Sequence, residues 1–139
     1  MCSAIPQPVA NLELFLKERG LICQSRKGPD PVFFGNTCLH YRDNFICIRL
    51  ASDRGLWTVD VADAARPAVW YDIGILRDFL IGHGEDVLPL PDQIAFIRTN
   101  WQAVLDCFNQ DQREKTHAQL SEMMVDRAKR RFPALYTDK

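Results

Sequence analysis

Residues 37–61 read TCLHYRDNFICIRLASDRGLWTVDV, and this stretch decides the fold. Apolar and polar side chains alternate along most of it, which is typical of strands with one buried face and one open face. Asp43-Asn44 is predicted to form a two-residue hairpin turn, because both residue types tolerate a positive φ. A second break, at residues 52–55, leads into Leu56. The stretch therefore predicts three consecutive antiparallel strands.

A turn at Asp43-Asn44 would also determine which side chains face each other across the first hairpin. It would place His40 opposite Cys47 and Cys38 opposite Arg49. One face then collects apolar side chains, which are predicted to be core: Leu39, Tyr41, Ile46, Ile48 and Leu50, with Trp57, Val59 and Val61 from the third strand. The other face collects a mixed polar set: Cys38, His40, Arg42, Cys47 and Arg49, with Thr58 and Asp60. Function is expected on this polar face if helices cover only the apolar one.

The flanking sequence completes the fold. Further short strands are predicted at residues 21–25, 32–34 and 68–71, with a hairpin turn at Gly35-Asn36. Helical spacing of apolar residues and helix-ending signals predict four helices, at residues 9–19, 72–82, 91–108 and 112–131. We expect one α+β domain over residues 1–139, an antiparallel β-meander of about five or six strands with an N-terminal helix and three C-terminal helices packed on it.

Composition agrees with a single soluble domain. The chain has 139 residues, of which 47% are hydrophobic and 25% charged, and no apolar run approaches the ~18 residues of a membrane span. The first residues lack the basic start and apolar stretch of a secretory signal. Five cysteines without a C-x-x-C pair favour reduced thiols over a disulfide framework. We therefore expect a cytoplasmic protein with no membrane partner.

Charge is distributed unevenly along the chain. Residues 53–92 contain eight acidic and three basic side chains, a net charge of −5, whereas each flanking segment has a net charge of +2. An acidic middle segment could meet a basic partner, although a merely solvated surface is the simpler explanation. Asp53, Asp60 and Asp63 would then steer the partner, with Trp70 or Tyr71 as an aromatic anchor.

Two chemical alternatives are open. Cys38, His40 and Cys47 could form a nucleophile–base pair or hold a metal ion on the polar face, but a fourth metal ligand and an oxyanion donor are not evident. His83-Gly84-Glu85-Asp86 has suitable residue types at no known ligand spacing, and the chain has no phosphate-binding glycine motif. We expect no catalytic residue, metal or cofactor.

A nucleic-acid accessory role is the other alternative. The basic run at residues 127–131 could contact phosphates, but cations at a helix C-terminus are also favoured by the helix dipole. We expect no direct nucleic-acid contact.

Three segments resemble a known class of proteins: WYDIGILRDFL at residues 70–80, FIRTNW at 96–101 and RAKRRFP at 127–133. Together they resemble small bacterial immunity proteins that are encoded beside polymorphic or contact-dependent secreted toxins. The resemblance covers the second half of the chain and lies in structural motifs. It implies a cytoplasmic protein that binds and neutralises one cognate toxin domain without turning over a substrate.

The predicted function is therefore binding of a toxin protein. The residues expected to contact the partner come from the polar strand face and the acidic segment: Asp53, Asp60, Asp63, Trp70, Tyr71, His40, Arg42 and Arg49.

Overall fold

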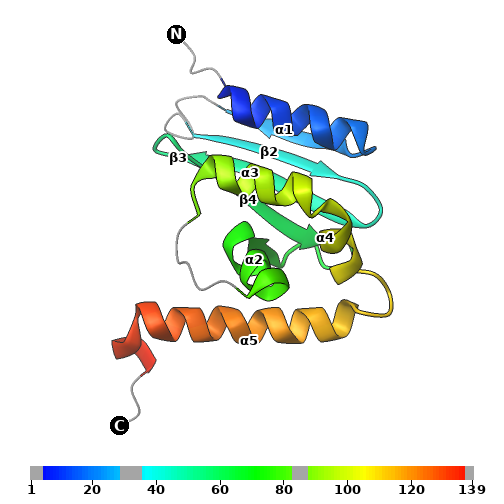
Figure 1. Cartoon of the computed structure of the whole chain (residues 1–139). Helices are drawn as coiled ribbons and strands as arrows, with labels where there is room; N and C mark the ends of the chain where they lie inside the picture. The colour runs from blue at the N-terminus through cyan, green and yellow to red at the C-terminus, as the bar shows by residue number, and fades with distance from the viewer. Residues whose placement is uncertain (1–4, 29–35, 83–87, 137–139) are drawn as a thin grey trace.

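The computed structural model describes residues 5–28, 36–82 and 88–136 (Figure 1). The elements follow the chain in this order: α1 (Gln7–Glu18), β1 (Ile22–Lys27), β2 (Thr37–Arg42), β3 (Ile46–Asp53), β4 (Leu56–Asp63), β5 (Trp70–Asp72), α2 (Ile73–Ile81), α3 (Leu90–Thr99), α4 (Trp101–Cys107), α5 (Arg113–Arg131) and the 3-10 helix η2 (Pro133–Tyr136). Strands and helices occupy separate parts of the sequence. The predicted α+β class is confirmed.

The five strands form one antiparallel sheet in sequence order, β1-β2-β3-β4-β5. This order is the predicted meander, because each strand pairs with the strand before it. The predicted strand at residues 32–34 and the turn that begins at Gly35 lie outside the described residues.

The first hairpin turn lies one residue later than predicted. Asp43 and Ile46 close it, since the Asp43 N–H donates to the Ile46 carbonyl at 3.1 Å. The Asp43 carboxylate also accepts hydrogen bonds from the N–H groups of Phe45 and Ile46, at 2.7 and 2.9 Å. Asn44 and Phe45 are therefore the turn residues. The side chain of Asp43 specifies this turn, because it binds the N–H groups two and three residues further on.

This turn shifts the register by two residues. His40 faces Arg49 instead of Cys47, and Cys38 faces Ala51 instead of Arg49. A shift of two keeps every side chain on its predicted face, because the side-chain period of a strand is two. The division into an apolar and a polar face is therefore as expected, while the individual pairs differ.

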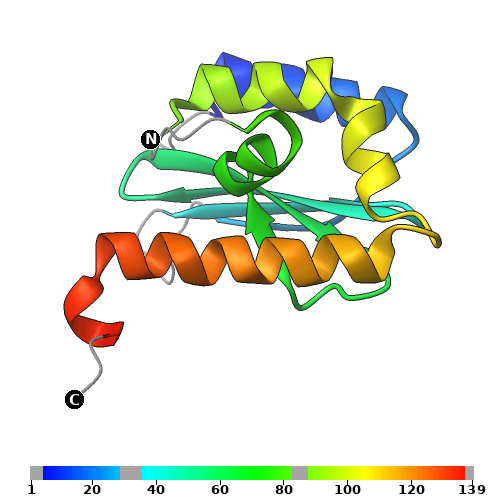
Figure 2. The same cartoon turned by 60° about the horizontal axis from the view of Figure 1, so that its bottom comes forward.

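The apolar face of the sheet forms the core with the helices. Its side chains are almost completely buried: Leu39, Tyr41, Ile46, Ile48, Leu50, Val59, Val61 and Tyr71. Trp57 packs against this core, as predicted. Helices α1 and α3 lie over this face, and Figure 2 shows both on the same side of the sheet. Helix α5 packs against α2 and runs beside the β5 edge.

The helix predicted over residues 91–108 is interrupted at Asn100. The Asn100 side chain donates to the Phe96 carbonyl at 3.0 Å, and its backbone leaves the helical conformation at φ −110° and ψ 25°. Asparagine favours such breaks because its amide competes for backbone groups. The change of direction lets Trp101 meet Phe15 of α1 edge-to-face, with ring centroids 5.6 Å apart.

The helices lie on the apolar side of the sheet and along its β5 edge, where Arg127 of α5 reaches Asp72 on the polar face (Figure 2). Away from that edge, the polar-face side chains of β1 and β2 are exposed or half-buried. In the part of the chain that the structure describes, no helix combines the length and apolar character needed to cross a bilayer.

We expect Asp43→Ala to lower the free energy of unfolding by about 1 kcal/mol, because two turn N–H groups lose their acceptor. Urea denaturation followed by circular dichroism would measure the change. Asp53→Ala is the matched control, since Asp53 lies at the next hairpin with its side chain 80% exposed. Equal destabilisation by both substitutions would contradict the role assigned to Asp43.

Candidate functional site

One row of polar side chains crosses the uncovered face of the sheet. Cross-strand pairing places Ser25 beside His40, His40 beside Arg49, Arg49 beside Asp60, and Asp60 beside Asp72. We call these five residues the polar row. Each belongs to a different strand, so the register of the whole sheet positions the row.

Trp70 lies beside the polar row and covers part of the sheet. Its strand partner is Ala62, which in turn pairs with Cys47, and both of these small side chains are completely buried. The indole ring reaches the polar row, where the Arg49 guanidinium lies 4.3 Å from its centroid. The His40 ring meets it edge-to-face at 5.4 Å. Small neighbours on β3 and β4 thus give a large ring room to lie across the sheet.

Arg49 is held on two sides. Its Nε and Nη2 donate to one carboxylate oxygen of Asp60, at 3.2 and 2.9 Å, while its face stacks on Trp70. Burial raises the pKa of Asp60, and neighbouring Asp72 adds to this effect, while Arg49 opposes it. Charge pairing and cation–π stacking together fix the guanidinium in one orientation.

The surroundings of His40 favour its neutral form. Burial lowers its pKa, and the positive charges of Arg42 and Arg49 lower it further. Its Nε2 is buried and has no hydrogen-bond partner among the described residues.

The last residue of the polar row is tied to α5. Arg127 donates to Asp72 at 2.9 Å. The run at residues 127–131, considered for nucleic-acid contact, thus begins with a cation that serves the fold. Lys129 and Arg130 further along α5 are exposed.

A second polar cluster lies on the covered side of the sheet. His117 of α5 bridges Asp63 and Tyr71: its Nε2 is 3.0 Å from the Asp63 carboxylate, and its Nδ1 hydrogen-bonds the Tyr71 hydroxyl. Arg113 donates to the same carboxylate at 2.7 Å. A neutral His117 satisfies both contacts if Nε2 carries the proton and Nδ1 accepts from Tyr71.

This cluster fastens α5 to the sheet. Asp63 is 0% exposed and Tyr71 1%, so no substrate or partner reaches them in this conformation. Burial alone would raise the pKa of Asp63, but the N–H of Ala65, His117 and Arg113 together outweigh it and lower the pKa. The carboxylate therefore stays ionised in a closed environment.

The sequence reasoning missed His117 and Arg113. Leu120 is buried on the inner face of α5, and His117 lies one turn before it on the same face. Asp63 and Tyr71 were expected at the partner surface, but the structure places both against α5. The reason is that odd-numbered β4 residues and Tyr71 point to the covered face.

The predicted cysteine chemistry depended on His40 and Cys47 facing each other, and they do not. His40 faces Arg49, and Cys47 is completely buried, which raises the pKa of its thiol. Residues 5–28, 36–82 and 88–136 contain no group of three His, Cys, Asp or Glu side chains placed to hold a metal ion. The predicted alternative at His83-Gly84-Glu85-Asp86 lies outside the described residues.

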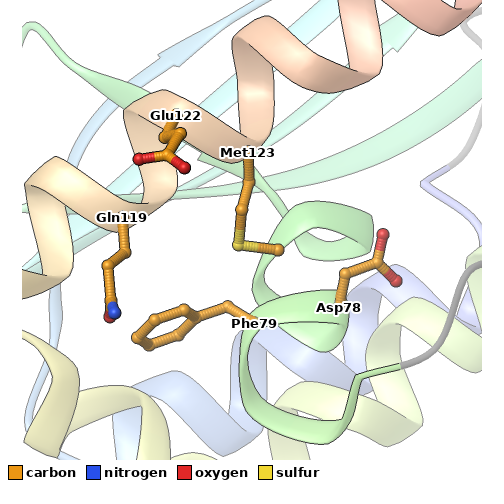
Figure 3. Close-up of a pocket in the computed structure, with 5 residues that line it drawn as sticks. All are labelled: Asp78, Phe79, Gln119, Glu122 and Met123. Atoms are coloured by element: carbon orange, nitrogen blue, oxygen red, sulfur yellow. The ribbon is translucent and has the colours of Figure 1, made fainter.

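A groove of about 430 Å³ lies between α2 and α5 (Figure 3). Phe79 and Met123 supply its apolar surface, and Asp78, Gln119 and Glu122 supply polar groups. Arg77 donates to the Asp78 carboxylate at 3.0 Å, so that acid already has a cation.

Asp53, another residue predicted to contact the partner, lies at the β3–β4 turn, away from the polar row.

Searches of protein-family models, curated proteins and solved structures found no match to this chain.

We expect Asp63→Asn to lower the free energy of unfolding by about 3 kcal/mol at pH 7, because two buried partners lose a charged acceptor. The folded-state pKa of Asp63 is lowered, so its stabilisation is present above the unfolded pKa of about 3.9 and is lost as pH falls through the folded value. The deficit of the variant should therefore shrink in acid.

Urea midpoints measured at about pH 3 to 7 would test this expectation. Asp111→Asn, at an exposed site, should change stability by less than about 0.5 kcal/mol. A deficit for Asp63→Asn that is independent of pH would contradict the assignment.

Proposed function

We propose that this chain is a bacterial cytoplasmic immunity protein that neutralises a cognate toxin domain by direct binding. The contact surface is the uncovered sheet face around Trp70. Its members are Trp70 and four neighbours from the predicted set, His40, Arg42, Arg49 and Asp60. Asp63 and Tyr71 serve the fold instead.

The observation that carries the proposal is the fixed, partly exposed Trp70. Tryptophan and arginine are the residues most enriched among those that dominate protein–protein binding energy. Here Arg49 lies 4.3 Å from the indole centroid and is itself held by Asp60. Because these side chains are already ordered, a partner would lose little conformational entropy in meeting them.

The surroundings of Trp70 also favour binding over turnover. The face is a paired sheet, whose backbone is hydrogen-bonded and rigid, and Arg49 and Asp60 at its centre are paired to each other. His40 is the group best suited to proton transfer, and its lowered pKa and buried Nε2 leave it poorly placed for that role. The resemblance of residues 70–80 to immunity proteins adds support from the sequence.

The direct test is binding to the secreted toxin domain encoded beside this gene. Co-expression should protect cells from that domain, and the two purified proteins should co-elute. Absence of a complex at micromolar concentration, together with absence of protection, would contradict the proposal.

We expect Trp70→Ala to weaken toxin binding by about 30-fold, since a central aromatic residue contributes about 2 kcal/mol or more. Isothermal titration calorimetry would measure the change, and circular dichroism would verify the fold. Phe132→Ala is the matched aromatic control, because Phe132 is 57% exposed but lies at the end of α5. Unchanged affinity for Trp70→Ala would exclude this face.

A further inference from the structure

The cations of the uncovered face are gathered on strands β1–β3. Lys27, Arg42 and Arg49 point to this face from those strands, whereas its acids Asp60 and Asp72 come from β4 and β5. Each of these two acids already holds an arginine. Both acids of the face are therefore paired, whereas Lys27 and Arg42 have no carboxylate partner among the described residues.

Arg42 is the least satisfied of these cations. Its hydrogen bonds go to two backbone carbonyls, those of Asp43 at 3.4 Å and Ala64 at 3.5 Å, both long. No carboxylate lies within salt-bridge distance of it in the described part of the chain. Two backbone carbonyls therefore orient the Arg42 guanidinium, while no carboxylate of the described residues neutralises its charge.

Arg49 also has a guanidinium nitrogen that is not used by Asp60. Asp60 receives its Nε and Nη2, which leaves Nη1 without a hydrogen bond among residues 5–28, 36–82 and 88–136. Both Arg42 and Arg49 lower the pKa of His40, so the three side chains share one electrostatic environment. This environment is positive and contains the buried, unpartnered His40 Nε2.

Two exposed apolar side chains flank this basic group. Ile22 pairs with Arg42 across β1 and β2 and is 66% exposed, and Phe45, in the β2–β3 turn, is 68% exposed. Cations beside exposed apolar groups complement a segment that carries both acids and an apolar residue.

We infer that an acidic segment of the protein partner docks over β1–β3. One carboxylate binds between Arg42 and Arg49 beside His40, and a neighbouring apolar side chain packs on Ile22 or Phe45. This inference rests on the proposed function and specifies the chemistry of the partner. A nucleic acid fits less well, because its regularly spaced phosphates would also meet Asp60 and Asp72 in the same row.

The test uses the full chain and two short peptides, acetyl-EELEE-amide and its neutral counterpart acetyl-QQLQQ-amide. Amide NMR shifts would locate binding. The acidic peptide should give saturable shifts confined to β1–β3, and its affinity should fall several-fold between about 20 and 200 mM salt. The neutral peptide should give none.

Arg42→Gln should weaken binding of the acidic peptide by about tenfold, and Arg42→Lys should restore part of it. Arg54→Gln is the matched control, because Arg54 is 92% exposed at the β3–β4 turn. The amide spectrum of each variant would show that the sheet is intact.

Three results would overturn the inference: no saturable shifts with the acidic peptide, shifts located at residues 129–131 of α5 instead, or tighter binding of oligothymidylate to the same face. If the peptide fails while Trp70→Ala still weakens the toxin complex, the inference falls and the proposed function stands. Loss of the toxin complex altogether would instead reject the proposed function.

Discussion

The structure depends on ion pairs that neutralise acids from the middle of the chain with cations from the segments before and after it. Asp60 pairs with Arg49 from the first part of the sequence, while Asp63 and Asp72 pair with Arg113 and Arg127 of α5. Strand β4 could not lie inside the sheet with Asp60 and Asp63 unpaired, because a buried charge without a partner costs several kcal/mol. The acids concentrated in the middle of the sequence thus form ion pairs with the cations of the flanking segments.

This pairing divides the sheet into two functional regions. On the covered side, Asp63, His117 and Tyr71 fasten a helix whose own apolar contribution is small, since Leu120 is its only completely buried apolar side chain among the described residues. On the open side, Arg49 and Asp60 hold each other in place, with the Arg49 guanidinium against the Trp70 ring. Among the described residues, the cations of this face without a carboxylate partner are Lys27 and Arg42, so this surface has the opposite charge from the segment that contains Trp70.

The sequence predicted the meander, both faces of the sheet and the helices around it, because each follows from local alternation, helical spacing and turn residues. It misplaced the first hairpin by one residue, since the Asp43 carboxylate, and not a positive φ, specifies that turn. Within the candidate site, the face of His40 and Arg49 was predictable. The neutralisation of the acids was not, because Asp63 and Arg113 are fifty residues apart and only tertiary packing brings them together. His117 is also far from Asp63 in the sequence, so its contact with Asp63 could not be predicted. Asp63 and Tyr71 were therefore predicted at the partner surface, whereas both lie on the covered face of the sheet.

The central claim is that recognition takes place at the Trp70 face while the other tryptophans serve the core. The most direct measurement is ¹⁹F NMR of the chain labelled with 5-fluorotryptophan, whose three resonances report Trp57, Trp70 and Trp101 separately. On addition of the toxin domain, the account predicts that the Trp70 resonance shifts while those of Trp57 and Trp101 stay where they are. A complex that co-elutes yet leaves the Trp70 resonance unchanged would contradict it.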